Sequence, residues 1–350
     1  MPPKRTAPTL NDVAQAAGVS TATVSRCLNS PDQVIGTTRE KVMKAVRLLG
    51  YSPHFGARAL AAKRTNTIGA IIPTMENAIF ARGLQAFQEE LRSRGYTLLV
   101  ASSSYRTDIE EEQIRSLVSR GADGLLLIGH VRGPSIYHFL ETQDVPALVA
   151  WTYDKTKALP SIGFDNRKSM RALAEKVVEM GHRRIAVISA AMAANDRARS
   201  RVQGVRDAMT AAGLDAENLP IIETTYGIDQ GAQAFDRLMG APVPPTAVIC
   251  GNDVLAVGAI KQARVLGLDV PGDVSVTGFD DIELATIVEP ALTTVHVPHR
   301  DMGARAARML IDIVERKSTS KAVELNADIR FRESLSPPSA WTEDAAGPVS

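Results

Sequence analysis

The chain has 350 residues, of which 45% are hydrophobic and 23% are charged, so it is long enough for two or three ordinary globular domains. Its longest apolar runs, such as residues 124–128, are far shorter than the roughly 20 residues of a membrane span, and no apolar segment follows the basic start as a secretory signal requires. The two cysteines, Cys27 and Cys250, predict no disulfide framework and favour the cytoplasm.

The net charge of +1 conceals an uneven distribution along the chain. Residues 1–66 carry ten Lys and Arg against three Asp and Glu, a balance of +7, whereas the remainder carries 30 basic and 36 acidic residues, a balance of −6. A basic segment attached to a mildly acidic body is typical of a module that binds a polyanion. A basic face exposed to solvent gives the same charge balance, so only the order of the residues can distinguish it from a polyanion-binding module.

Two short helices are predicted at the start of the chain. Thr9 followed by Asp12 is a capping-box pattern, and Gly18 allows the chain to turn after the first helix. Ser20 is expected to cap a second helix over residues 21–29. The gap of about three residues between the two helices is what a helix-turn-helix requires. A third helix is expected to be capped by Thr37, with Glu40 three positions on, and to end at Gly50.

The second predicted helix has two different faces. Val24 and Leu28 are four positions apart and are expected to face a core, and the outer face carries Thr21, Ala22, Ser25 and Arg26. Short side chains let a helix approach base edges in the major groove, and arginine can bind guanine bidentately. The pattern predicts a DNA-reading helix, with a purely structural three-helix domain as the alternative.

These motifs resemble the head of the lactose/galactose repressor family of transcriptional regulators. The resemblance is carried by residues 9–14, 17–20, 23–26, 38–42 and 49–53. It implies a sequence-specific repressor that binds double-stranded DNA. The candidate DNA contacts of the head are Thr9, Ser20, Thr21, Ala22, Ser25, Arg26 and Asn29.

The family also has a short hinge helix, which the resemblance places at about residues 55–62. It would enter the minor groove from both subunits of a dimer, with Leu60 as the wedge at a central base step and Ala57 beside it. Such a wedge unstacks the bases at a cost that the contacts of a bent duplex offset. A plain linker is the alternative.

From residue 67 onward, short apolar runs alternate with amphipathic helical segments. Strands are expected at residues 67–72, 96–101, 124–128, 147–150, 184–189, 221–224, 247–250 and 274–277. Helices are expected at residues 80–94, 109–120, 168–180, 197–212, 229–239 and 253–266. This alternation predicts an α/β fold with parallel sheets, whose ligands bind beyond the carboxyl ends of the strands.

The family resemblance extends into this part through residues 181–186, 201–204, 252–259, 278–281 and 290–295. It implies a periplasmic-binding-protein-like core of two parallel-sheet lobes with a ligand between them. The chain would cross between lobes near Asp165 and again after Thr293, and a helix over residues 301–314 would complete the first lobe. The expected domains are a head (1–53), a hinge and linker (54–66), an effector-binding core (67–335) and a disordered tail (336–350).

Sugar recognition needs planar polar side chains and usually an aromatic ring against the apolar face of the sugar. The candidate effector-binding residues are Asn77, Phe80, Asp165, Arg201, Tyr226, Asn252, Phe279 and Asp280. Arg201, Asn252 and Asp280 match recurrent ligand contacts of the family. Each candidate has a structural alternative, because Arg201 fits a surface helix, Asn252 a helix cap, Asp280 a turn cap, and the two phenylalanines a core.

The identity of the effector is less determined. Residues 77–80 and 163–166 resemble the gluconate-operon repressor branch, and a sugar acid would suit the guanidinium of Arg201. Neutral sugars also use arginine in this family, so a sugar or a sugar acid is expected. A regulator whose ligand promotes DNA binding, and an activator, remain alternatives.

Other classes of protein are less favoured. No phosphate-binding glycine loop or dinucleotide-binding motif is present, and the six histidines show no metal-ligand spacing, so no catalytic residue, metal or cofactor is expected. A sugar-processing enzyme and a transport-linked binding protein are the remaining alternatives. The tail from residue 336 has no heptad repeat, so a homodimer is expected rather than a coiled-coil tetramer. Two-fold symmetry predicts a pseudo-palindromic operator, and the short apolar runs predict no membrane partner.

Overall fold

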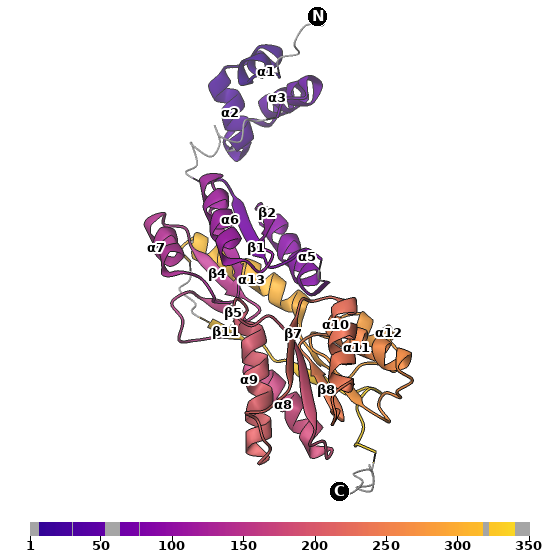
Figure 1. Cartoon of the computed structure of the whole chain (residues 1–350). Coiled ribbons are helices and arrows are strands. Elements are labelled where there is room, and N and C mark those ends of the chain that lie inside the picture. Colours follow the sequence, from indigo (N-terminus) through magenta and orange to yellow (C-terminus); the bar gives the residue numbers. More distant parts are fainter. Residues whose placement is uncertain (1–6, 30, 53–63, 77, 318–321, 340–350) are drawn as a thin grey trace, which may run out of the picture. The chain divides into compact units, whose positions relative to one another are not determined.

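The computed structural model describes residues 7–29, 31–52, 64–76, 78–317 and 322–339 (Figure 1). The chain divides into two compact units, Met1–Thr65 and Asn66–Ser350. Among the helices of these described ranges, none has the length and apolar character to cross a membrane.

The first unit contains three helices around a small core. They are α1 (Leu10–Ala17), α2 (Thr21–Asn29) and α3 (Gly36–Leu49), with a short 3-10 turn η1 (Pro31–Gln33). The predicted capping box of α1 is confirmed, because Thr9 Oγ1 accepts a hydrogen bond from the Asp12 N–H at 3.3 Å and the Thr9 N–H donates to Asp12 Oδ2 at 2.7 Å. The main-chain N–H and the hydroxyl of Thr9 both donate to Asp12 Oδ2, and these two hydrogen bonds lower the pKa of Asp12. The buried residues of this core are Val13, Ala14, Val24, Cys27, Val42, Ala45 and Tyr51.

The cap predicted for the third helix is wrong. α3 begins at Gly36, and Ile35 takes the N-cap position without a side-chain hydrogen bond. The carbonyl of Ile35 already accepts hydrogen bonds from the N–H groups of Thr38 and Arg39, both at 3.0 Å. Thr37 therefore lies inside the first turn of the helix. The predicted end at Gly50 is confirmed, with a left-handed φ of +64°.

The second unit consists of two α/β lobes, as the alternation predicts. The first lobe has a six-stranded parallel sheet of order β11-β5-β4-β3-β1-β2. Its strands are β1 (Thr67–Ile72), β2 (Thr97–Ser102), β3 (Gly124–Ile128), β4 (Ala147–Ala150), β5 (Ser161–Gly163) and β11 (Ala322–Glu324). Its helices are α5 (Ala78–Ser93), α6 (Thr107–Ser119), α7 (Pro134–Thr142) and α13 (His299–Val314).

The second lobe has a four-stranded parallel sheet of order β7-β6-β8-β9. Its strands are β6 (Ile185–Ala190), β7 (Ile221–Thr224), β8 (Ala247–Cys250) and β9 (Ser275–Thr277). Its helices are α8 (Asn166–Glu179), α9 (Asp196–Ala211), α10 (Ile228–Met239), α11 (Asp253–Val265) and the short α12 (Leu284–Ile287). All eight predicted strands and six predicted helices of the core are present, with ends shifted by two residues or fewer.

The chain passes between the lobes where the sequence predicts it. It leaves the first lobe after β5 and returns through β10 (Thr294–His296) into α13. β10 pairs antiparallel with β12 (Asp328–Arg330), and beyond β12 the Ser334 carbonyl accepts from the Val276 N–H of the second lobe at 2.9 Å. Both lobes are therefore built from separated stretches of chain.

The C-terminal helix completes the first lobe, as expected. α13 packs along α5 so closely that a Cβ at Gly303 would lie 2.0 Å from the main-chain oxygen of Gly83 (Figure 1). The following strand β11 pairs in parallel with β5. The sequence did not predict β11, because this strand has only three residues and contains no long apolar run.

Candidate functional site

The outer face of α2 is arranged as a DNA-reading surface would need to be. Thr21, Ala22 and Arg26 are exposed and Ser25 is partly exposed, whereas Val24 is fully buried in the core of the head. Ser20 Oγ accepts a hydrogen bond from the Thr23 N–H at 3.2 Å and so caps the helix. The cap fixes the first turn, where the short side chains lie.

Several predicted site residues cannot be placed. Ala57 and Leu60 of the predicted hinge helix, and the effector candidate Asn77, lie outside the described residues. For Asn29 only the main chain, at the end of α2, is described.

A small cavity of about 20 Å³ lies between the two lobes of the core. Its lining comes from both of them: Ile79, Phe80, Tyr105 and Trp151 from the first lobe, and Asn195, Arg197, Arg201, Tyr226 and Asp280 from the second. Four of the predicted effector residues are thus brought together. The parallel strands β2, β4, β7 and β9 end toward this cavity, as the general rule for such sheets predicts.

The aromatic residues of this cavity form two pairs. Phe80 meets Trp151 edge-on with ring centroids 5.4 Å apart, and Tyr105 and Tyr226 lie 5.8 Å apart from opposite lobes. Tyr105 follows Ser104 in a loop where both residues have left-handed φ values, +58° and +51°. Non-glycine residues in that region cost about 1–3 kcal/mol each and are characteristic of functional sites. Burial and the neighbouring Tyr226 raise the pKa of Tyr105, so its hydroxyl stays protonated.

Arg201 is held in place by the interior rather than exposed on its helix. Its Nε donates to Asn166 Oδ1 at 2.9 Å and its Nη1 to the Gly251 carbonyl at 2.6 Å. The guanidinium lies 3.8 Å above the centre of the Phe279 ring. Nη2 is 3.6 Å from Asp280 Oδ1, too far for a hydrogen bond. This end of the guanidinium therefore forms an ion pair with Asp280 but no hydrogen bond to it.

Asp280 is a buried carboxyl group without hydrogen-bond partners. The residue is 1% exposed, and neither side-chain oxygen has a hydrogen bond within the described part of the chain. Burial raises the pKa of Asp280 to about 7, although the nearby charges of Arg201 and Arg197 act in the opposite direction. Buried polar groups are normally paired, so two bare oxygens facing a cavity indicate a place for hydrogen-bond donors from a ligand.

The neighbouring Asp281 has a different role. It pairs with Arg332 Nη2 at 2.6 Å and with His296 Nδ1 at 2.8 Å. Burial alone would raise the pKa of Asp281, but the hydrogen bonds from Arg332 and His296 lower it. Asp281 is thus held by side chains of the protein and does not line the cavity.

Three other effector candidates do not line the cavity. Asn252 Oδ1 caps α11 by accepting from the Leu255 N–H at 2.9 Å, while its buried Nδ2 has no partner in the described residues. Asp165 caps α8 by accepting from the Lys168 N–H at 3.0 Å. Phe279 is fully buried beneath Arg201. These residues support the lining rather than form it.

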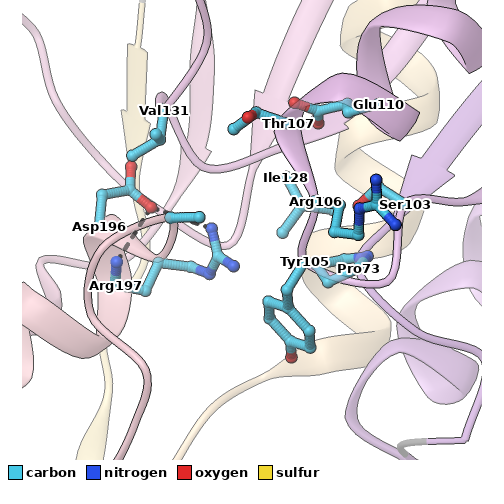
Figure 2. A pocket seen from close by; sticks show the side chains of 11 residues that line it. Pro73, Ser103, Tyr105, Arg106, Thr107, Glu110, Ile128, Val131, Asp196 and Arg197 are labelled. Atoms are coloured by element: carbon cyan, nitrogen blue, oxygen red, sulfur yellow. Dashed lines mark hydrogen bonds and ion pairs between the residues drawn. The ribbon is translucent and has the colours of Figure 1, made fainter.

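A second cavity of about 20 Å³ lies beside the first and shares Tyr105 and Arg197 with it. Figure 2 shows Asp196 and Arg197 on one side of it and Tyr105 on the other. The lobes touch here, because the His130 N–H donates to Asp196 Oδ2 at 2.6 Å. Gly129, with φ +70°, allows this approach, since a Cβ there would lie 2.0 Å from Arg197 Nη1.

Sequence reasoning missed Tyr105, Trp151, Asn195, Arg197 and Ile79 as lining residues. Trp151 follows β4 directly, and Tyr105 follows β2 by three residues, so the rule of strand ends could have found both. Asn195 and Arg197 lie at the start of α9, where the amino end of a helix faces the cleft. No local signal distinguishes Ile79 from a core residue of α5.

Comparison with known proteins agrees with this architecture. Residues 9–54 match the bacterial regulatory proteins of the lacI family, and residues 174–335 match a periplasmic binding protein-like domain. The chain is 33% identical to catabolite control protein A of Priestia megaterium over 328 residues, which cover 93% of this chain and 98% of that protein. It is 34% identical to the HTH-type transcriptional repressor CytR of Escherichia coli (strain K12) over 310 residues, covering 88% and 90%.

Among solved structures, the lac repressor dimer bound to operator and the anti-inducer ONPF matches with a TM-score of 0.83 and 26% identity, covering 94% of this chain and 99% of that chain. The predicted helix-turn-helix head and periplasmic-binding-protein-like α/β core are confirmed. From its head to the end of its core, the chain belongs to the lacI family of bacterial regulatory proteins.

Proposed function

We propose that this protein is a transcriptional repressor that binds operator DNA through the outer face of α2 and is controlled by a sugar or sugar acid in the cavity between the lobes. The single observation that carries the effector proposal is Asp280, whose two buried oxygens face this cavity without hydrogen-bond partners in the described chain. A ligand that offers two hydroxyl groups would pair both oxygens.

The rest of the lining suits the same class of ligand. The two aromatic pairs offer apolar ring surface, which packs against the apolar face of a sugar. Arg201 and Asn195 add polar groups to the lining, although Asn195 Oδ1 also caps α9. Two guanidinium groups, of Arg197 and Arg201, line this cavity, and a guanidinium group can bind a carboxylate, which keeps gluconate among the candidates.

The proposed mechanism is a change in lobe orientation in a homodimer. Both lobes contribute to the lining, so a bound ligand contacts both and favours one relative orientation. In a symmetric dimer this alters the spacing of the two reading helices on a pseudo-palindromic operator. The coupling is reciprocal, so operator DNA changes effector affinity by the same factor. The lac repressor structure, a dimer with operator and a small molecule bound, supports this arrangement by analogy.

The experiment begins with a thermal-shift screen of the full chain against D-glucose, cellobiose, D-gluconate, glucose 6-phosphate, cytidine and hypoxanthine, since a ligand of the native state raises its stability. Arg201→Ala should abolish a hit, whereas Arg199→Ala, an exposed cation on the same helix, should retain it. Operator affinity is then measured with a duplex selected by the protein from a random pool. A hit that survives Arg201→Ala, or operator affinity that no hit changes, contradicts the proposal.

The sign of the response separates two versions of the function. Release of DNA by the ligand gives an inducible repressor, and tighter DNA binding gives a co-repressed one. The same cavity serves either version, because the ligand needs only to prefer one lobe orientation.

A further inference from the structure

Two buried polar residues begin the helices that follow the lobe crossings. Asn166 is the first residue of α8, after the chain leaves the first lobe, and His299 is the first residue of α13, after the chain returns. They are 3% and 4% exposed. Neither lines the cavity, yet each contacts residues that do.

His299 joins a residue of one lobe to a residue of the other. Trp151 Nε1 donates to His299 Nδ1 at 3.3 Å, and His299 Nε2 lies 3.2 Å from the Asp280 carbonyl oxygen. An indole N–H can only donate, so Nδ1 is the acceptor and the proton lies on Nε2, which donates to the carbonyl. Burial lowers the pKa of His299 to about 4, which keeps the ring neutral and this tautomer in place.

Asn166 makes the corresponding connection at the other crossing. Its Nδ2 donates to the Trp151 carbonyl at 3.1 Å, and its Oδ1 accepts from Arg201 Nε at 2.9 Å. Trp151 is therefore bonded through its side chain toward Asp280 and through its main chain toward Arg201. These are the two charged residues on which the effector proposal rests.

The backbone at two of these positions is held in an unfavourable conformation. Trp151 has a φ of +61° and Asp280 a φ of +105°, both in the left-handed region. Such conformations persist in non-glycine residues when the surroundings impose them. The indole is also closely confined, because a Cβ at Gly83 would lie 2.5 Å from its ring. Trp151 thus has little room to move independently of its two hydrogen-bond partners.

We propose that Asn166 and His299 are positioning residues that transmit occupancy of Arg201 and Asp280 to the orientation of the first lobe through Trp151. The proposal rests on the proposed function for its ligand, but the relay itself is a property of the protein without ligand. When a ligand binds Asp280 and Arg201, the hydrogen bond between Asp280 and His299 and the one between Arg201 and Asn166 shift. Trp151, which is bonded to both His299 and Asn166, then has to shift as well. Because the two relay residues begin the helices after two of the three crossings, the displacement reaches segments about which the lobes turn.

The first test needs no effector. Full-length protein carrying Trp341→Phe, which leaves Trp151 as its one tryptophan, is labelled with ¹⁵N at the indole nitrogen. The relay predicts an indole proton that exchanges slowly with solvent. His299→Phe should remove this protection, and His299→Gln should keep it, since a glutamine amide can both accept and donate. Rapid exchange in the parent protein, or protection unchanged in His299→Phe, would overturn the relay.

The second test measures coupling. The ratio of operator affinities with and without a hit from the named panel is determined for the parent, His299→Phe, His299→Gln, Asn166→Ala and the exposed α13 control Arg305→Ala. Coupling of this kind is roughly 5- to 150-fold, and His299→Phe and Asn166→Ala should reduce it toward one while His299→Gln and Arg305→Ala retain it.

Thermal melts separate a positioning role from a structural one. Loss of stability with an unchanged coupling ratio in both His299→Phe and Asn166→Ala would overturn the proposal. If the parent protein itself shows no response to any panel member while its indole remains protected, the proposed function fails and the relay geometry stands.

Discussion

The reading surface of α2 and the cavity of the core are built in opposite ways. On α2 the candidates Thr21, Ala22 and Arg26 are exposed, while the helix is stabilised by Val24 and Cys27 on its other face. In the cavity the candidates are themselves buried, Arg201 at 6% and Asp280 at 1% exposure, and the side-chain oxygens of Asp280 have no hydrogen-bond partner in the described chain. The head thus separates recognition from stability, whereas the core combines them in the same residues.

Among the substitutions that test this comparison, Asp280→Asn is expected to have the largest effect on stability. Because the pKa of Asp280 rises from 3.8 to about 7 on folding, the native state binds its proton more tightly. The contribution of this proton to the free energy of unfolding is complete below pH 4 and is lost as the pH rises through 7. The loss is on the order of 1–4 kcal/mol.

Unfolding by urea at several pH values should show this decline in the parent protein and a smaller one in Asp280→Asn. The variant should also be more stable than the parent at pH 8 and should lose effector binding. If the substitution leaves the pH profile unchanged, the carboxyl group of Asp280 does not cause the pH dependence of stability.

Gly129→Ala and Gly36→Ala compare the two regions at the level of the backbone. At Gly129 the new Cβ would meet Arg197 Nη1 at 2.0 Å with a φ of +70°, whereas at Gly36 in α3 no atom lies within 4 Å. We expect Gly129→Ala to cost about 1–3 kcal/mol and to loosen the contact between lobes. Gly36→Ala should change stability by roughly 0.5 kcal/mol or less. If chemical unfolding shows the same loss of stability for Gly129→Ala and Gly36→Ala, the two glycines do not differ in the way proposed.

Arg26→Ala tests whether recognition in the head is independent of its stability. A base contact of this kind contributes about 1–3 kcal/mol, so operator affinity should fall roughly 5- to 150-fold. The melting temperature should stay unchanged, because Arg26 is exposed. A fluorescence anisotropy titration with the selected duplex gives the affinity. Unchanged affinity would exclude Arg26 from the reading surface.

Thr9→Ala is the smallest expected effect. Loss of the capping box should destabilise the head by about 1 kcal/mol, since Thr9 Oγ1 no longer accepts from the Asp12 N–H. Thr9→Ser should keep most of that stability. Hydrogen exchange of the α1 amides reports the change. An effect of equal size on the core would contradict the independence of the two regions.

The same contrast explains what the sequence could predict. The head residues are neighbours on one helix, so a period of 3.6 residues was sufficient to separate Val24 from Thr21 and Arg26. In the core, strand ends and family motifs led to Arg201, Tyr226 and Asp280. They did not lead to Arg197 or Tyr105, whose proximity depends on how two lobes meet. Nor could they show that Asn252 caps a helix beside the cavity while Asp280 faces into it.

The interleaved path of the chain has a consequence for synthesis on the ribosome. The first lobe lacks α13 and its edge strand β11 until residue 324 has emerged, although its other strands end at residue 163. The second lobe lacks the bond between Val276 and Ser334 until almost the whole core has been made. The core of the head ends at Tyr51, and we expect this unit to fold by itself. During synthesis the head is therefore expected to fold long before both lobes of the core, and the cavity between them, are complete.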